Sequence, residues 1–233
     1  MILLSLDTSS RDASIAVRRD DDVLLEYNFT SRDNLSAVLI PSLEFILKAL
    51  GMEMAEIDGY GIGIGPGLFT GIRIGMATMK GLVFAEKKPV VGVTSLMALA
   101  AKFAACDQNV IPLIDAKKGD VYLGGYRFDQ GDALELFSPC LLKMADCVPL
   151  LEKIPDKIFV GSGAETHRDF LAARFGASRC LLRSNFLANE VGLIARRQFR
   201  NRHFLTDLQD LQPFYLRQPD AETNLGHSAG TGD

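Results

Sequence analysis

The sequence predicts an α/β fold built from two similar halves, each a mixed β-sheet flanked by helices. Strand-like and helix-like apolar patterns alternate along the chain, as expected of sheets covered by helices. A strand pattern that ends in an aspartate and passes through a short turn into another strand occurs at residues 2–18 and again at residues 110–127. This repeated order indicates an internal duplication.

The first half is expected to open with an antiparallel meander and to continue through helices and parallel strands. Its expected strands are Ile2–Leu6, Ala13–Arg18, Val23–Phe29, Asp58–Ile64 and Pro89–Val93. Its expected helices are Ser36–Leu50, a second that follows Thr70 and runs to about Glu86, and Leu96–Ala105. Gly51 is expected to end the first helix as its C′ residue. Thr70 is expected to cap the second helix, and Thr94 or Ser95 the third.

The second half is expected to repeat the strands and to end in a long helix. Its expected elements are the strands Val110–Ile114, Val121–Arg127 and Lys157–Val160, and the helices Glu165–Phe175 and Asn189–Arg202. These patterns predict an N-terminal half at residues 1–107 and a C-terminal half at residues 108–204. Residues 205–217 are expected to pack back on the first half, and the polar stretch 218–233 to form a flexible tail.

A glycine-rich stretch between a strand and a helix, residues 59–75, is the most distinctive part of the chain. Gly61, Gly63 and Gly65 alternate with isoleucines, so one face of the strand is bare backbone. We expect another part of the protein, or a ligand, to approach that face closely. Neither the Rossmann pattern G-x-G-x-x-G nor the P-loop Gly-Lys-Ser/Thr fits this stretch. Tight packing of the strand and the helix is the simpler interpretation.

The same stretch carries a resemblance to a known family. The pattern G-x-G-P-G-x-F-T-G-x-R-x-G resembles the signature of the TsaB (YeaZ) family. Its residues here are Gly65, Pro66, Gly67, Phe69, Thr70, Gly71, Arg73 and Gly75. Further similarity covers Leu6–Ser9, Val91–Leu96, Ile114–Ala116, Gly119–Tyr122 and Pro213–Arg217. Two positions depart from the family: Leu68 stands where Ser is more common, and Leu35 lies near a common His. We assign no hydroxyl or imidazole role to either position.

The resemblance implies an actin/hexokinase/Hsp70-like fold, also called ASKHA or ribonuclease H-like. It also implies a non-catalytic scaffold subunit of the bacterial complex that makes N6-threonylcarbamoyladenosine (t6A) in tRNA. In that complex a TsaD-type subunit transfers the threonylcarbamoyl group to the adenosine next to the anticodon, and a TsaE-type ATPase takes part. The resemblance further implies homodimers when the partner is absent and only indirect contact with tRNA. It implies no resident cofactor, although ATP or ADP could bind at the complex interface.

Two phosphate-binding hairpins expected of that superfamily look degenerate in this chain. Such hairpins join a strand, an Asp and a Gly-containing turn, because only Gly lets backbone amides close around phosphate oxygens. The first copy has Asp7 and Thr8 but no glycine, and the second has Asp115 with Gly119 only at its far end. Turn capping is therefore the preferred role for both aspartates. The alternative function, a free-standing ATP-dependent small-molecule kinase, would need intact hairpins and a catalytic carboxylate.

Composition and the remaining motifs argue against several other classes of protein. The three histidines, His167, His203 and His227, lack the spacing of a zinc or peptidase site, so we expect no metal site and no catalytic site. The formal net charge of −4 argues against a protein that binds nucleic acid unaided. The arginines near the end of the last helix are therefore expected to form a solvated face; they are Arg196, Arg197, Arg200 and Arg202. Four cysteines without a C-x-x-C pair, together with no signal peptide or apolar span, favour the cytoplasm and no contact with a membrane.

The two long helices of the first half each carry more apolar surface than one sheet face can cover. The excess residues predict either a deep helical core or a subunit interface. We interpret them as a partner interface. The candidate interface residues are Leu35, Val38, Phe45, Ala49, Met76, Met79 and Val83.

Overall fold

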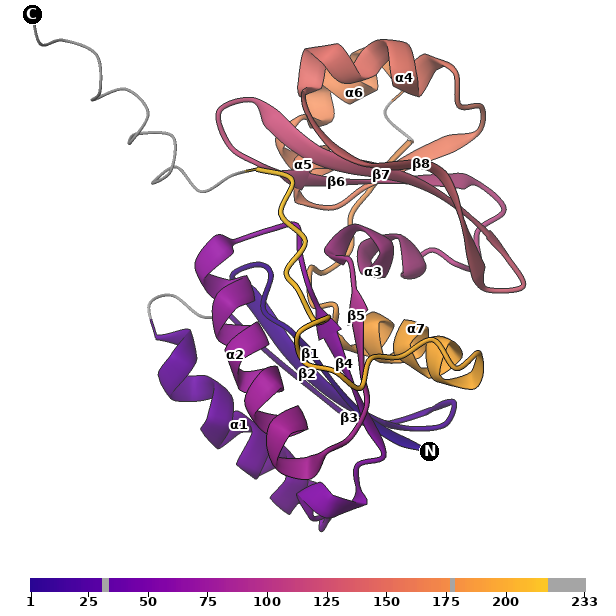
Figure 1. The fold of residues 1–233 in the computed structure, drawn as a ribbon. Coiled ribbons are helices and arrows are strands. Elements are labelled where there is room, and N and C mark those ends of the chain that lie inside the picture. Colours follow the sequence, from indigo (N-terminus) through magenta and orange to yellow (C-terminus); the bar gives the residue numbers. More distant parts are fainter. Residues whose placement is uncertain (31–33, 177–178, 218–233) are drawn as a thin grey trace, which may run out of the picture.

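The chain folds into two five-stranded mixed sheets with helices on their faces (Figure 1). The computed structural model describes residues 1–30, 34–176 and 179–217. The first sheet has the strand order β3-β2-β1-β4-β5 and the second has β10-β9-β6-β7-β8. The predicted tail at residues 218–233 lies outside the described residues.

The first half contains five strands and three α-helices among the described residues. The strands are β1 (Ile2–Asp7), β2 (Asp12–Arg19), β3 (Asp22–Thr30), β4 (Gly59–Gly63) and β5 (Val90–Val93). The helices are α1 (Leu35–Leu50), α2 (Phe69–Glu86) and α3 (Ser95–Ala101), with a short 3-10 helix η1 (Met54–Glu56).

The second half and the helix that follows it complete the fold. The strands are β6 (Asn109–Asp115), β7 (Asp120–Asp129), β8 (Asp132–Lys143), β9 (Lys157–Val160) and β10 (Cys180–Leu181). The helices are η2 (Met144–Cys147), α4 (Val148–Glu152), α5 (Ser162–Thr166), α6 (Arg168–Phe175) and α7 (Ala188–Arg200).

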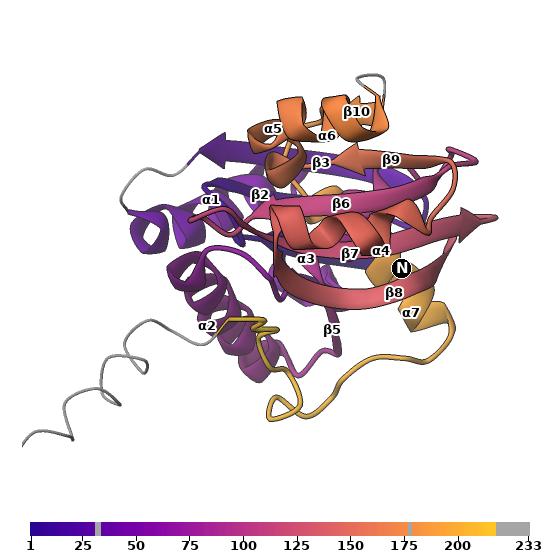
Figure 2. The same ribbon diagram turned by 90° about the horizontal axis from the view of Figure 1, so that it is seen from above.

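The sheet pairings confirm the predicted duplication. Strand β1 pairs antiparallel with β2 and parallel with β4, and β6 pairs antiparallel with β7 and parallel with β9. Both sheets therefore share one topology around their first strand. The halves lie one above the other, with α3 between the sheets and α4, α5 and α6 on the outer side of the second sheet (Figures 1 and 2).

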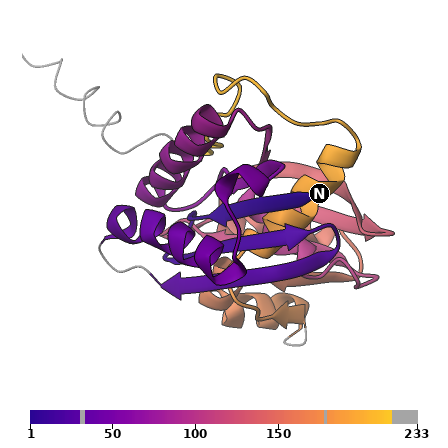
Figure 3. The same cartoon turned by 90° about the horizontal axis from the view of Figure 1, so that it is seen from below.

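The two faces of the first sheet are covered by different helices. Leu4 and Leu6 of β1 pack with the core formed by α1 and α2, which lie next to each other along the sheet (Figure 3). Ser5 points to the other face, where its Oγ donates to the carbonyl oxygen of Ala188 in α7 at 2.7 Å. The alternation of β1 therefore sets α1 and α2 apart from α7.

The ends of the helices test the predicted caps. Gly51 ends α1 in the left-handed conformation and donates to the carbonyls of Leu47 and Lys48, which confirms its predicted role. Thr94 caps α3, because its Oγ accepts from the N–H of Met97 at 3.3 Å. Both caps follow from local sequence alone.

The predicted cap of α2 is wrong. The helix begins at Phe69, so Thr70 lies inside the first turn, where it is exposed. The residue at the N-cap position is Leu68, and its side chain makes no capping bond. A backbone contact anchors this end instead, since the N–H of Leu68 donates to the carbonyl of Ser9 at 2.6 Å.

The segment after α7 returns to the first sheet. Leu205 forms a two-bond bridge with Val90 at the free edge of β5, and Leu211 is buried in the core under α1 and α2. The predicted limits of the two halves as folding units stay predictions. Within the described residues, no helix is both long enough and apolar enough to cross a membrane.

Candidate functional site

The glycines of the signature stretch let α2 pack against the turn between β1 and β2. A Cβ atom added to Gly67 would lie 2.1 Å from the carbonyl oxygen of Ser9, and one added to Gly71 would lie 2.1 Å from that of Thr8. A Cβ on Gly75 would meet Thr8 Oγ1 at the same distance. Any side chain at these positions would force the helix away from the turn. The glycines therefore serve packing within the chain.

The bare face of β4 is covered by α7. A Cβ on Gly59 would lie 2.6 Å from the ring of Phe199, and one on Gly61 would lie 3.1 Å from Ala195. This confirms the expectation that something approaches that face closely. The partner is a helix of the same chain.

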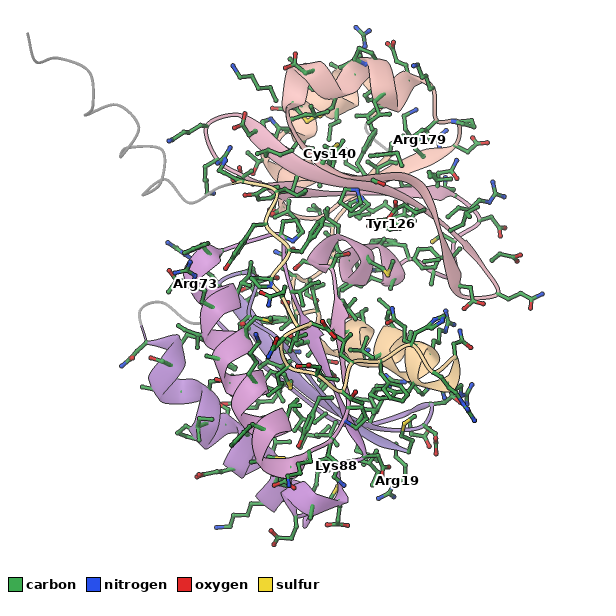
Figure 4. All side chains as sticks on the ribbon, in the orientation of Figure 1. Arg19, Arg73, Lys88, Tyr126, Cys140 and Arg179 are labelled. Carbon is green, nitrogen blue, oxygen red and sulfur yellow. The ribbon has the colours of Figure 1, made fainter. Side chains whose placement is uncertain are left out.

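Phe69 and Arg73 of the signature form a stack on the surface. The Arg73 guanidinium lies 3.8 Å from the centroid of the Phe69 ring, whose other neighbour is the ring of Tyr215 at 5.0 Å. Arg73 lies at the beginning of α2, on the side of the molecule where the C-terminal segment emerges (Figure 4). The loop before the helix contains a cis Gly65-Pro66 bond, and the Gly65 carbonyl accepts from the N–H of Ser95. The signature residues thus join α2, α3 and the C-terminal segment, residues 205–217.

Asp7 is buried and does not face solvent. Its side chain accepts a hydrogen bond from Ser9 Oγ at 3.1 Å, and its Oδ1 has no hydrogen-bond partner among the described residues. Burial raises the pKa of Asp7 to about 7, against the hydrogen bonds from Ser9 that favour the charged form. In this conformation Asp7 is not placed to meet a nucleotide phosphate. Thr8 is committed too, because its Oγ1 donates to the Gly71 carbonyl at 2.8 Å.

Asp115 is held by its own turn. One carboxylate oxygen accepts from the backbone N–H of Lys117 at 2.8 Å, and the other pairs with Lys117 Nζ at 2.6 Å. Partial burial opposes ionisation of Asp115, but the hydrogen bonds and charge of Lys117 outweigh it and lower the pKa of Asp115. Among the described residues, no cluster of three or more His, Cys, Asp or Glu side chains could hold a metal ion. The two aspartates act within their own halves.

Part of the exposed surface of α1 is apolar. Val38 is 40% exposed and Phe45 is 57% exposed, while Leu35 is half-buried and Ala49 exposed. Phe45 keeps one aromatic contact within the chain, to the ring of Tyr27 at 5.7 Å. These four residues are at least partly accessible, and their role as an interface stays a prediction.

The structure corrects the prediction for α2. Met76, Met79 and Val83 are at most 5% exposed and belong to the core of the first half. Their stripe faces the sheet, so they have no surface to offer a partner. The outward stripe of the helix contains instead Ala77, Gly81 and Phe84. Phe84 was missed by the sequence analysis, although it continues the i, i+4, i+7 spacing from Ala77.

The structure also corrects the predicted solvated face of α7. Arg196 is only 5% exposed and pairs with Asp21, and Arg197 pairs with Asp132 at 3.7 Å. Arg200 and Arg202 are exposed as expected. The arginines therefore point in different directions around the helix.

Comparison with known proteins assigns the family. The model of the family described as TsaD: tRNA N6-adenosine threonylcarbamoyltransferase matches residues 29–225. The tRNA threonylcarbamoyladenosine biosynthesis protein TsaB of Bacillus subtilis is 28% identical over 226 residues, which are 95% of this chain and 96% of that protein. The chain belongs to the TsaB (YeaZ) family.

Other members support this assignment in sequence and structure. TsaB of Haemophilus influenzae is 27% identical and covers 93% of this chain and 94% of its own length. The solved structure of YeaZ from Pseudomonas aeruginosa is 25% identical, with a TM-score of 0.76, and covers 92% of this chain and 99% of that one. The chain therefore shares both the length and the fold of its relatives.

Proposed function

We propose that this TsaB-family chain is a non-catalytic scaffold subunit in t6A synthesis that binds a TsaD-type subunit through the outer surface of α1 and α2. The observation that carries the proposal is the exposed apolar surface on these helices, in a chain whose Asp7 is buried and whose Asp115 is held by Lys117. The names of its relatives, tRNA threonylcarbamoyladenosine biosynthesis proteins, support the pathway.

The proposed docking face consists of Val38 and Phe45 on α1 and Phe84 on α2. Phe45 is 57% exposed and Phe84 is 77% exposed. Large apolar side chains that are exposed together on neighbouring elements often mark a site where another protein binds. Ala77 and Gly81, the two small residues of the α2 stripe, leave room for a helix to approach closely. A pair of partner helices packed there would complete a four-helix arrangement.

The remaining roles follow from this one. A TsaE-type ATPase is reached through the complex, and tRNA is contacted by the partner, consistent with the net charge of −4. Without the partner, the same apolar face would pair with a second copy of the chain. Any ATP or ADP would bind at the subunit boundary, and the complex would work in the cytoplasm.

The rival function is a free-standing kinase that uses ATP. Such an enzyme needs a carboxylate that reaches the bound nucleotide, whereas Asp7 is buried and Asp115 is tied to Lys117. We therefore expect no ATP hydrolysis by the isolated chain. Turnover above a blank that is lost in Asp7→Asn would support the kinase.

The experiment that tests the proposal is affinity purification of the tagged chain from its native cell at endogenous expression, followed by mass spectrometry. A TsaD-type protein should be the main partner in stoichiometric amount. A matched purification of Phe45→Glu should recover the chain without that partner. Recovery of the chain alone, or of the same partner with both baits, would contradict the proposal.

A further inference from the structure

Two buried arginines face each other between the first sheet and α7, on the side away from the proposed docking face. Arg18 lies on β2, on the same face of the strand as Ser14, whose Oγ accepts from the N–H groups of Leu187 and Ala188. Arg196 lies on α7, and each arginine is 5% exposed. The site is near the end of β2, where Arg19 is labelled in Figure 4.

The chain satisfies these guanidinium groups only in part. Arg18 donates to the side-chain oxygen of Asn189 and, at 2.7 Å, to the carbonyl of Asp21. Arg196 pairs with the carboxylate of Asp21. Arg18 Nε, Arg196 Nε and Arg196 Nη1 are buried and have no hydrogen-bond partner among the described residues. Three donor nitrogens on two adjacent guanidinium groups therefore have no acceptor.

Among the described residues, Asp21 is the one carboxylate that forms an ion pair with either arginine. Burial and the charge of Arg196 both lower the pKa of Arg18. The charge of the buried carboxylate of Glu190 also acts on Arg18, but Glu190 is paired with Lys102 at 3.1 Å. Asp21 is 72% exposed at its side chain and lies in the turn between β2 and β3. Buried charged donors are normally satisfied in folded proteins, and breaking such a pair is strongly unfavourable.

We propose that Arg18 and Arg196 form a binding site for a small oxyanion, a phosphate group, whose place the Asp21 carboxylate takes in the free chain. Guanidinium groups match the geometry of phosphate oxygens through paired N–H donors. A phosphate offers more acceptors than one carboxylate, so it can accept hydrogen bonds from both guanidinium groups at once. Asp21 is exposed on a short turn and can swing outward without unfolding the sheet. The phosphate comes either free or as the monoester of a nucleotide.

The test is isothermal titration of the full chain with inorganic phosphate at constant ionic strength. Asp21→Asn removes the competing charge and should tighten phosphate binding by about tenfold or more, a gain that one charge-assisted hydrogen bond can supply. Arg196→Gln should abolish binding. The same titrations with adenosine monophosphate show whether a free phosphate or a nucleotide phosphate is preferred.

Two matched variants control for net charge. Asp132→Asn removes a carboxylate that pairs with the neighbouring Arg197, and Arg197→Gln removes the same charge one position along α7. Equal phosphate affinity in Asp21→Asn and Asp132→Asn would overturn the proposal, as would equal losses in Arg196→Gln and Arg197→Gln. If Arg196→Gln does not fold, the comparison of Asp21→Asn with Asp132→Asn decides alone. The outcome is independent of partner binding, because the site lies on the opposite side of the first sheet from α1 and α2 (Figure 1).

Discussion

At the scale of single residues, burial decides the charge state of the aspartates at the ends of β1 and β6. Asp7 keeps its carboxyl inside the fold, so the folded state favours the protonated form. Asp115 is only partly buried, and its turn favours the charged form. The sequence placed both aspartates at strand ends, but it could not show this difference, because burial depends on helices distant in the chain.

Asp7 should make the chain less stable as the pH rises. Its pKa is about 7 in the folded protein against 3.8 for the ordinary group, so the folded state binds the proton more tightly than the unfolded state. The stabilisation is complete below pH 3.8 and is lost as the pH rises towards 7. The difference in unfolding free energy between Asp7→Asn and the native chain should therefore shift in favour of Asn by roughly 4 kcal/mol from pH 4 to pH 8. Urea unfolding of both proteins across that range measures the shift, and a constant difference would refute it.

The two threonines at helix starts should respond differently to substitution. Thr94 caps α3 through its hydroxyl, so Thr94→Ala should lower the unfolding free energy by about 0.5–2 kcal/mol, while Thr94→Ser should retain most of it. Thr70 is exposed inside the first turn of α2, and Thr70→Ala should change stability by less than about 0.5 kcal/mol. Denaturant unfolding of the three variants checks the assignment. A larger loss at Thr70 than at Thr94 would restore the predicted cap.

At the scale of elements, α2 is positioned by its glycines on one side and left free on the other. Gly71 touches the backbone of Thr8, whereas Gly81 has no atom within 4 Å of an added Cβ. The sequence predicted close packing around this stretch. It could not tell which glycine meets the turn, because that depends on the rotation of the helix about its axis.

Replacing each of these glycines with alanine should have opposite effects. Gly71→Ala forces backbone atoms apart and should destabilise the chain by roughly 1–3 kcal/mol or more. Gly81→Ala fills open space on an exposed helix and should stabilise it by about 0.5–1 kcal/mol. Thermal and urea unfolding of the two single variants measures both. Equal effects would mean that the packing of α2 on the β1–β2 turn is not as described.

Strand β8 is the largest element that the sequence analysis missed. A turn signal was present in the sequence, since Gly131 stands among the polar residues Asp129, Gln130 and Asp132. In the structure Gln130 and Gly131 have positive φ angles and join β7 to β8. The strand itself is mostly exposed in its first half, where Leu134 and Leu136 are exposed, so its apolar residues do not mark a buried face. Strands that are paired on one edge but little buried are poorly marked by hydrophobicity.

At the scale of the whole molecule, the duplication was predictable but the link between the halves was not. The C-terminal segment crosses both halves: Phe214 donates from its N–H to the Ile64 carbonyl at 2.8 Å, and Arg217 Nη1 donates to the Ala116 carbonyl at 2.7 Å. Arg217 also pairs with Asp120. These contacts join residues that are 97 or more positions apart in the sequence, which local patterns do not encode.

Dependence on contacts between distant parts of the chain also explains why the predicted interface residues are accessible on α1 but buried on α2. Helical spacing identified two apolar stripes on α1 and on α2, but only the sheet decides which stripe is covered. On α1 the predicted stripe is the outer one, and on α2 it is the inner one. The docking face proposed from the structure therefore keeps Phe45 and replaces Met79 with Phe84.

The most direct test of the scaffold account is the affinity of Phe45→Glu for the TsaD-type subunit, measured beside its melting temperature. Phe45 is mostly exposed in the free chain, so the variant should melt like the native protein. In the complex it would bury a charge, and its affinity should fall by roughly ten- to a thousandfold. Leu134→Glu, at an equally exposed position on β8 in the other half, is the control and should bind normally. Unchanged affinity of Phe45→Glu, or an equal loss in the control, would contradict the proposed docking face.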